Sequence, residues 1–382
     1  MNTKQNIIYI RGIKRLKNTV LCVDSNDQKT YYDPISKTRV GFSSGAQVKR
    51  CVREKMVENL GKTLSKVTIN YLIDGNGILK QSTAEVNSNP LNLDSLVFGW
   101  MITSSKKETK SKKNSSDEDD SSDETKNVNT EGVTKASAVS ISPLTPLHPF
   151  LTSIKKGDLQ TLDRLDNIET CKINIFKETG KNKSVQLTDE EIKNFLNEKN
   201  RMMPKAIYTS KSKIDGIFSF DFAIDLRTLF SVQVNGYKTQ VTKETEKELV
   251  KNGWKYGKNE FGEILLAPKE VRENAIEALC DALVDWQFKT NQSSNFSPSV
   301  TDAISVSFDV RKASNAISAE VFDREASAVI DPDYVDNIFV DKSAKSYLGN
   351  CDNYAKPFAI DDAKAKIAEM IRSYDYEQYL NK

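Results

Sequence analysis

The chain has 382 residues, 38% of them hydrophobic, and its 55 Lys and Arg residues nearly balance 53 Asp and Glu residues, for a net charge of +2. This length and apolar content allow one large domain or two ordinary ones, and the total charge does not indicate a nucleic-acid partner. The five cysteines lie far apart without a CxxC pair, which predicts reduced thiols in a cytoplasmic protein. The N-terminus lacks the apolar core of a signal peptide, and no run approaches the ~18 apolar residues of a membrane span, so we predict a soluble protein without a membrane partner.

The residue types that carry most enzyme chemistry are scarce. The single histidine, His148, stands between Leu147 and Pro149, and no motif supplies the partners of a catalytic triad or the further ligands of a zinc site. Neither GxxxxGK[ST] nor GxGxxG occurs, so a nucleotide-binding phosphate loop is not indicated. We therefore predict no catalytic residue, no metal and no cofactor, although these absences leave enzymes built on carboxylates alone open.

The first 55 residues are locally basic, with twelve Lys and Arg residues against four Asp and Glu residues, a balance of +8. They open with NIIYIRGIKR, residues 6–15, an apolar and β-branched run that predicts a central strand. We expect this strand to lead into a basic loop over residues 11–39 with room for a short hairpin. Arg11, Lys14 and Arg15 would then extend a basic track at the end of the strand.

The next stretch, VGFSSGAQVKRCVREKM at residues 40–56, predicts a helix that ends near Gly61. Its buried stripe has helical spacing and comprises Val48, Cys51, Val52 and Met56. Lys49, Arg50 and Arg53 lie in its first turns, where the helix dipole already presents partial positive charge and acidic residues are stabilising. The sequence therefore predicts that an anionic partner compensates these three positive charges.

The small and polar residues before this helix suit an anion. Ser43 and Ser44 supply hydroxyls, Gln47 supplies an amide, and the unpaired N–H groups of a helix N-terminus bind phosphates. We predict a nucleic-acid-binding site in which Lys49, Arg50 and Arg53 supply the charge. The alternative is a capped helix with a solvated basic face.

Further along, hydrophobic periodicity predicts strands at 67–74, 216–226 and 303–310 and helices at 93–102, 187–200, 268–288 and 363–374. Residues 104–134 are almost devoid of apolar side chains, with a basic half followed by an acidic half, which predicts a disordered insertion. Strands and helices alternate without βαβ regularity, so we predict an α+β fold with one antiparallel sheet and helices against one face.

Five segments follow from these patterns. They are an N-terminal part of the main body at 1–103, the charged insertion at 104–134, a strand at 135–146, a projection at 147–213, and a C-terminal part with its tail at 214–382.

Several stretches resemble, in the same order, motifs of the backbone subunit of type I CRISPR Cascade complexes, most closely the type I-E form. The stretch SKTRVGFSSGAQVKRCVREK is similar to the family's FGxxRxRxSSQxxKRAxR, and LDSLVFGWM at 93–101 is similar to DxxLFGRM. KASAVSISPLTPLHPF resembles a segment that ends in HAITTH, IDGIFSFDFAIDL resembles SGxFYRYxxxxL, and SNFSPSVTDAISVSFDVRKASNAIS resembles a late alanine-rich motif. The serines and Gln47 are displaced from the family spacing, and Trp100 replaces the arginine of FGRM.

The resemblance implies a ferredoxin-like, RNA-recognition-type palm with finger insertions and a thumb hairpin within residues 147–213. It implies a noncatalytic subunit whose copies form a helical filament along guide CRISPR RNA, grip its phosphates, and leave its bases to pair with target DNA. Other CRISPR effector subunits would be further partners. Phe150 and Leu151 are the candidate residues for a thumb wedge between bases, against the alternative that they are simply packed.

Two other functions stay open. A type III-like backbone subunit would cleave target RNA with a metal ion and a loop aspartate, for which Asp24, Asp27 and Asp33 are candidates, although aspartates in such loops commonly form turns. A structural or interaction protein with a charged linker is the third possibility, and it would purify without bound RNA.

Overall fold

The computed structural model describes residues 5–24, 27–73, 75, 77–86, 89–101, 133–157, 159–161, 174–180, 183–198, 207–209, 211–236, 238–288 and 297–380. The insertion predicted at 104–134 therefore lies outside the described residues except for its last two. Within the predicted projection at 147–213, residues 158, 162–173, 181–182, 199–206 and 210 also lie outside the described residues.

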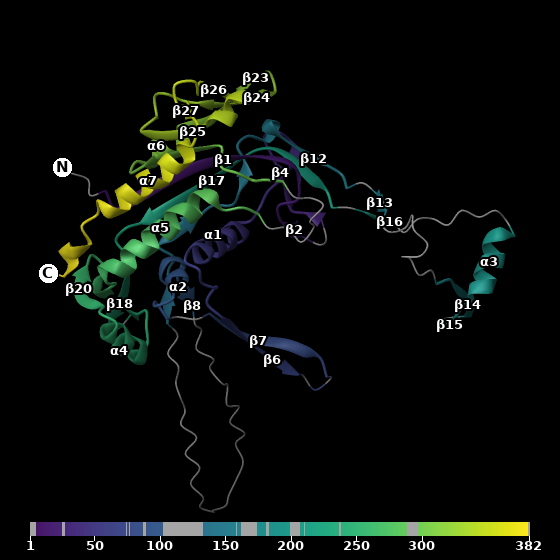
Figure 1. The fold of residues 1–382 in the computed structure, drawn as a ribbon, viewed down its shortest axis with the longest axis horizontal. Helices are drawn as coiled ribbons and strands as arrows, with labels where there is room; N and C mark the ends of the chain where they lie inside the picture. The colour runs from purple at the N-terminus through teal and green to yellow at the C-terminus, as the bar shows by residue number, and fades with distance from the viewer. Residues whose placement is uncertain are drawn as a thin grey trace, which may run out of the picture.

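An eight-stranded sheet forms the centre of the fold (Figure 1). Its central strand β1 (Ile7–Thr19) pairs antiparallel with β17 (Lys213–Asp225) on one side and with β22 (Ala303–Ser307) on the other. The order is β10-β17-β1-β22-β25-β27, with β11 and β12 also paired to β17. The outer strands are β10 (Val139–Ile141), β11 (Thr145–Pro146), β12 (Thr152–Lys155), β25 (Asn337–Asp341) and β27 (Ala355–Lys356), and β25 and β27 run parallel.

Strand β1 is longer than the sequence indicates. The predicted basic loop over residues 11–39 is wrong in its first part, because β1 continues to Thr19, paired with β17 as far as that residue and with β22 at residues 9–13. After it come β2 (Val23–Asp24), β3 (Asp27–Gln28), and a hairpin of β4 (Thr30–Asp33) and β5 (Thr38–Gly41). Cations at 11–15 therefore alternate between the two faces of a sheet instead of sharing a loop.

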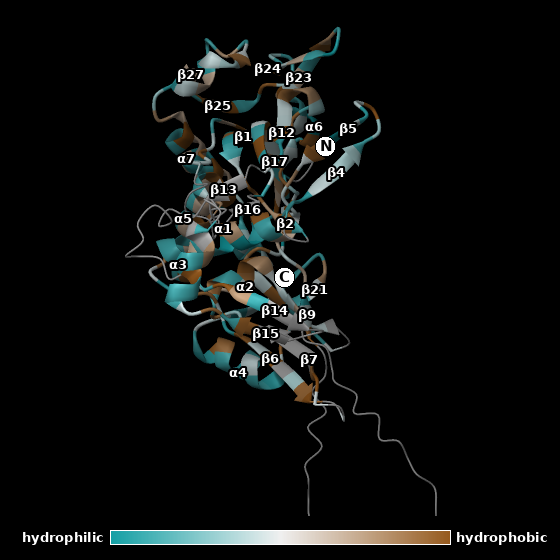
Figure 2. Cartoon of the chain, turned by 90° about the vertical axis from the view of Figure 1, so that its right-hand side faces the viewer, coloured by the Kyte–Doolittle hydropathy of each residue, from teal (hydrophilic) through white to brown (hydrophobic). Residues whose placement is uncertain are grey.

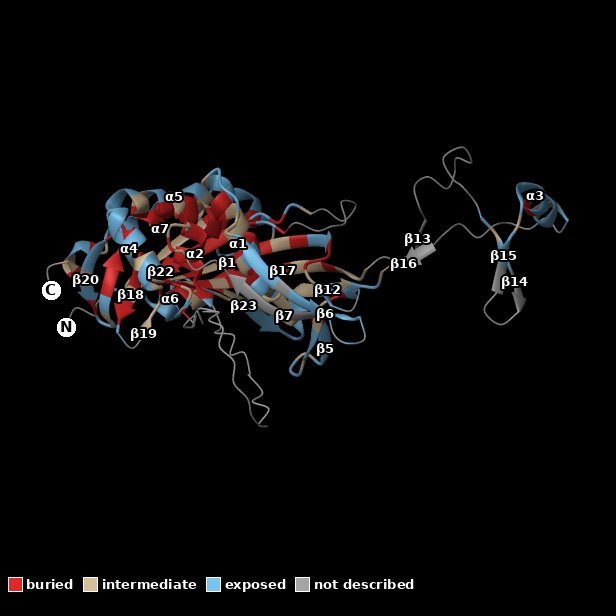
Figure 3. Ribbon diagram, turned by 90° about the horizontal axis from the view of Figure 1, so that it is seen from below, coloured by how far each residue is buried: buried red, intermediate tan, exposed pale blue. Residues whose placement is uncertain are grey.

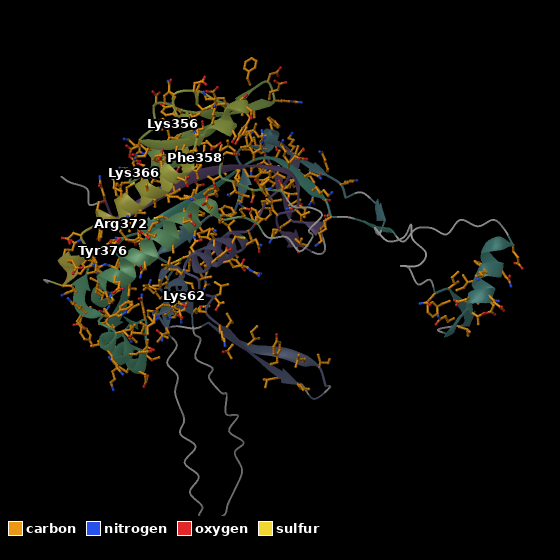
Figure 4. All side chains as sticks on the ribbon, viewed as in Figure 1. Lys62, Lys356, Phe358, Lys366, Arg372 and Tyr376 are labelled. Carbon is orange, nitrogen blue, oxygen red and sulfur yellow. The ribbon has the colours of Figure 1, made fainter. Side chains whose placement is uncertain are left out.

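Helices cover one face of the sheet, as predicted. They are α1 (Gly45–Asn59), α2 (Leu93–Phe98), α5 (Lys269–Asp285) and α7 (Ala359–Arg372), close to the spans expected from their apolar periodicity. The main core lies between these helices and the inward side chains of the sheet, where Trp286 meets Phe220 edge to face at 5.2 Å. Arg372, labelled in Figure 4, joins α7 to α5 through an ion pair with Glu273 at 2.7 Å.

The second face of the sheet is covered in part by α6 (Val310–Asn315) and by a small sheet of β23 (Ile317–Phe322), β24 (Glu325–Ile330) and β26 (Leu348–Gly349). The 3-10 helices η1 (Pro149–Leu151) and η4 (Lys342–Ser346) lie beside it. A second core cluster lies here, formed by Ile13, Ile217, Ala303, Ile317, Ala328, Ile330, Val340, Ala344, Leu348 and Cys351. The fold is thus α+β, a ferredoxin-like antiparallel palm with insertions.

The remaining elements lie at the periphery. A four-stranded sheet contains β18 (Ser231–Asn235), β19 (Lys238–Thr239), β20 (Lys255–Asn259) and β21 (Gly262–Leu266), with α4 (Lys243–Lys251) after β19 and η5 (Tyr376–Tyr379) against β20. Short strands β8 (Trp100–Met101) and β9 (Thr134–Lys135) pair with each other. The hairpin of β6 (Val67–Ile73) and β7 (Leu79–Val86) extends outward from the body in Figure 1.

Beyond β12 the chain forms short ribbons away from the main sheet. These are β13 (Leu159–Thr161) with β16 (Ile207–Thr209), and β14 (Phe176–Gly180) with β15 (Lys183–Gln186). Helix α3 (Asp189–Asn197) follows β15, and its capping box joins Thr188 and Glu191. The described part of this segment is largely exposed in Figure 3. Among the described residues, no helix is long and apolar enough to cross a membrane.

Candidate nucleic-acid interface

Lys14 lies inside the protein, on the helix-covered face of β1. Its side chain has no solvent exposure, 0%, and Nζ donates to the Trp286 carbonyl at 3.0 Å, the Ser299 carbonyl at 2.7 Å and Thr301 Oγ1 at 3.0 Å. Burial lowers the pKa of Lys14 to about 7, because the charged form loses its hydration. An RNA contact by this residue is incompatible with its burial, so the expectation for Lys14 is wrong.

Arg11 lies on the opposite face and is already paired. Its Nε is 2.7 Å from Asp221 Oδ1 on the neighbouring strand β17, and Nη1 donates to the Ser314 carbonyl at the end of α6. The guanidinium therefore ties α6 to the second face of the sheet. The Arg11 side chain is 23% exposed to solvent, which limits its access to a ligand.

Arg15 shares this second face and has a different environment. Its guanidinium lies over the Tyr347 ring, 5.0 Å from the centroid, and Nη1 is 3.3 Å from Ser346 Oγ. The ring is held in turn, because the Tyr347 hydroxyl donates to Asp302 Oδ2 at 2.6 Å and the Arg15 backbone N–H donates to the same oxygen at 3.0 Å. A stacked guanidinium that is still partly exposed keeps N–H donors available for a phosphate.

Ser346 is the last residue of η4 and Tyr347 follows it, and neither belongs to a stretch identified from the sequence. They meet Arg15 only because β25 and η4 fold beside β1 and β22, more than 300 residues along the chain. No local pattern around η4 indicates this contact, so periodicity could not have found it.

The predicted donors before α1 separate into two roles. Ser44 caps the helix, since its Oγ accepts from the Gln47 N–H at 3.3 Å. Ser43 is fully buried in a backbone bridge with Leu144, and its hydroxyl has no hydrogen-bond partner among the described residues. The helix start packs closely on the chain at 141–143, because a Cβ on Gly45 would lie 3.1 Å from the Ile141 carbonyl.

Two of the three α1 cations that the sequence marked as RNA-binding residues, Arg53 and Lys49, are committed to α2. Arg53 Nη2 lies 2.7 Å from Asp94 Oδ2, and this carboxylate, only 3% exposed, also accepts from the Ser65 N–H and hydroxyl. Lys49 Nζ donates to the Phe98 carbonyl at the end of α2, 2.9 Å away, and burial followed by the charge of Arg53 lowers the pKa of Lys49. The negative partner that the sequence indicates is thus present within the protein, as a buried carboxylate and a helix C-terminus.

Arg50, the third of these cations, faces solvent. Its side chain is 69% exposed and forms an ion pair at 2.8 Å with Glu54, one turn later. A pair of this kind on a helix surface contributes only about 0.3–0.5 kcal/mol, so a phosphate can replace the carboxylate at small cost.

The two candidate wedge residues lie in η1, beside β24. Leu151 packs against the second core cluster, which is the alternative that the sequence left open. Phe150 is 37% exposed, and its ring centroid is 5.1 Å from that of His148. Nδ1 of His148 accepts from the Phe150 N–H at 3.2 Å, so the histidine caps η1.

The loop aspartates have structural partners. Asp27 accepts from the Ser212 N–H at 2.6 Å, and Asp33 accepts from the Ser36 N–H at 2.7 Å in a turn. Within the described ranges, no three His, Cys, Asp or Glu side chains are grouped so that they could hold a metal ion.

No protein-family model and no curated protein matches this chain. The solved structures that resemble it include two at 10% sequence identity. A "CRISPR RNA-guided surveillance complex" chain matches over 94% of this chain and 99% of its own length with a TM-score of 0.40. A "CRISPR RNA-guided surveillance complex, pre-nicking" chain matches over 96% of this chain and 88% of its own length with a TM-score of 0.43.

Proposed function

We propose that this chain is a noncatalytic backbone subunit of a CRISPR interference complex, which assembles along guide RNA and grips its phosphates. The observation that carries the proposal is the convergence in the fold of stretches that resemble the family's motifs. Strands β17 and β22, which lie in two of these stretches, flank β1 on its two sides. Helices α1 and α2, which lie in two others, are joined by the ion pair of Arg53 with Asp94.

The geometry refines which residues act in this proposal. Arg15 and Arg50 are the cations best placed to contact phosphate, and Ser44 and Gln47 lie half-buried at the start of α1. Lys49 and Arg53 act through α2 by fixing the position of α1, and Lys14 is left out. Phosphate contacts position an RNA without specifying its sequence, as a subunit that accepts any guide requires.

The other partners follow from the same proposal. Target DNA would be recognised by pairing with the guide bases, while further copies and other effector subunits would contact the palm and the segment at 147–213. This segment joins the palm through β12, which pairs with β17 from Thr152↔Gly216 to Lys155↔Lys213. A deletion of residues 158–210 with a short linker leaves this pairing intact.

The test uses the full chain with guide RNAs of increasing length and with partner subunits supplied. We expect particle mass to rise by whole copies and nuclease protection to recur at regular intervals. The variant lacking residues 158–210 should still bind RNA but lose the periodic protection. If the wild-type protein shows no stepwise assembly, the backbone-subunit proposal is rejected, and if periodicity survives the deletion, the thumb assignment is rejected.

A further inference from the structure

The β4–β5 hairpin is a rigid projection that the proposed interface does not use, and it stands out from the body in Figure 2. At its base the Gln28 amide donates to the Lys29 and Phe42 carbonyls at 2.8 and 3.1 Å. At its tip Asp33 accepts from the Ser36 N–H, and the Ser36 and Thr38 hydroxyls lie 2.8 Å apart. Both ends of the hairpin are therefore held before any partner binds.

Two adjacent tyrosines on β4 lie on opposite faces of this hairpin. Tyr31 has a packing role, because its ring meets that of Phe42 edge to face at 5.5 Å. Tyr32 is 57% exposed, and its side chain has no ring, hydrogen-bond or ion-pair partner in the described part of the chain. An aromatic ring on a rigid scaffold without a protein partner is free to stack on a ligand.

A cation accompanies Tyr32 on the same face. Arg39 is directly opposite Tyr32 in the antiparallel register, so the two side chains are cross-strand neighbours. Arg39 is exposed, and its Nη1 donates to Thr30 Oγ1 at 3.4 Å. Among the described residues, no carboxylate forms an ion pair with its guanidinium. The hairpin's own carboxylate, Asp33, is engaged by the Ser36 turn.

The composition of this face decides its partner. The cross-strand pairs that alternate onto it are Thr30 with Gly41 and Tyr32 with Arg39, so no aliphatic side chain of the strands lies there to receive an apolar peptide. An exposed aromatic ring beside an exposed guanidinium is the pair that single-stranded nucleic acid uses, with stacking on the base and charge on the phosphate. The hairpin also packs on β12, where the segment at 147–213 leaves the palm, so it adjoins the proposed RNA path.

We propose that Tyr32 and Arg39 form an accessory contact for single-stranded RNA, in which Tyr32 stacks on one base and Arg39 binds a neighbouring phosphate. The contact rests on the proposed function, because it extends the same RNA-binding surface. It tolerates any base, since every base offers a ring face, and it therefore suits a protein that accepts different guides.

The test is fluorescence anisotropy of the full chain with a labelled single-stranded RNA of mixed sequence. Tyr32→Ala should weaken binding about tenfold, in the range found for loss of one stacked base. Tyr32→Phe should bind as wild type because the ring remains. The matched control, Tyr31→Phe, keeps the packing on Phe42 and should also leave affinity unchanged. Arg39→Ala should lower the slope of log affinity against log salt by about 0.7.

A second probe separates stacking from other effects. With an RNA whose bases are replaced by abasic spacers, Tyr32→Ala and wild type should bind equally, since no base is present to stack. An equal loss on both RNAs would overturn the stacking contact, as would unchanged affinity of Tyr32→Ala on the normal RNA. A Tyr32→Ala variant that alters self-association in the absence of RNA would also overturn it, because the face would then bind protein.

The outcomes also distinguish this inference from the proposed function. If Arg15→Ala weakens RNA binding and Tyr32→Ala does not, the hairpin contact fails and the RNA-binding function stands. If wild-type protein binds neither RNA, alone or with partner subunits, the function itself fails and the hairpin contact with it.

Discussion

Lys14 and Arg15 are adjacent in the sequence, yet they belong to regions of the molecule with opposite character. Lys14 points into the helix-covered core, where three oxygens surround its ammonium and Trp286 lies 4.4 Å away. Arg15 lies on the other face, stacked on Tyr347 and partly exposed. Successive side chains of a strand point to opposite faces of the sheet. The position of each cation along β1 therefore decides whether it lies in the core or is available to bind a ligand.

Helix α1 repeats this division at helical spacing. Lys49 and Arg53 are one turn apart and both contact α2, whereas Arg50 lies on the exposed side beside Glu54. A count of basic residues therefore overstates the charge that is available to RNA, because several of these cations are already bound by carboxylates or carbonyl oxygens of the protein itself. The predictions below test this division, from the largest expected effect to the smallest.

Asp94→Ala should have the largest effect, on stability. It removes the buried carboxylate that holds Arg53 and Ser65, and the loss of one partner of a buried ion pair costs about 3–5 kcal/mol. Denaturant unfolding measures the change, and Glu54→Ala is the control, since its pair with Arg50 is exposed. Equal stabilities of the two variants would show that the α1–α2 contact is not a structural one.

Lys14 should make stability depend on pH. Its pKa falls from 10.5 to about 7 on folding, so between these values the unfolded chain binds more protons and the free energy of unfolding rises with pH. Lys14→Met removes this term, and the difference between wild type and variant should change by about 2 kcal/mol from pH 7 to pH 9. Lys135, whose pKa burial also lowers to about 7, keeps part of the rise in the variant.

The control for this measurement is Lys17→Met, which changes an exposed residue of the same strand. Its unfolding free energy should follow the wild-type pH profile. A Lys14→Met profile parallel to wild type would contradict the buried, neutralised state of Lys14 at high pH.

Arg15→Ala should lower RNA affinity about tenfold, the effect of losing one hydrogen bond to a charged group, with unchanged preference among RNA sequences. Arg15→Lys should recover only part of the loss, because an ammonium lacks the planar fork that stacks on Tyr347. Filter binding on several RNAs measures this. A loss restricted to particular sequences would indicate a base contact instead.

Arg50→Ala should have the smallest effect. It should change the free energy of unfolding by less than about 0.5 kcal/mol, because its ion pair is exposed. It should reduce the salt slope of RNA binding by about 0.7, the contribution of one phosphate on a single strand. A salt slope equal to wild type would remove Arg50 from the interface.

Sequence periodicity determined much of the fold. The apolar stripe of α1, the alternation of Phe218, Phe220 and Phe222 in β17, and the span of α5 are local patterns with local causes. Each pattern predicts one buried face, and burial of apolar surface is the main force that places these elements against one another. The α+β class and the helix-covered face of the sheet follow from them.

The site depended on contacts that no local pattern contains. Residues 11–15 resemble the start of a basic loop, because Lys14 places a charge in the middle of the apolar face of β1. In the structure, buried oxygens accept hydrogen bonds from this side chain and burial lowers its pKa, so the strand continues. Arg53 is held by Asp94, which lies tens of residues further along the chain. Arg15 is held by Ser346 and Tyr347, which lie hundreds of residues further along. These distant partners determine whether each guanidinium is available to a ligand. The sequence by itself determined which segments become strands and helices, because that choice depends on neighbours along the chain. Only the tertiary structure decided which cations are left for a ligand, because neutralising a charge depends on which groups are brought within a few ångströms of it in space.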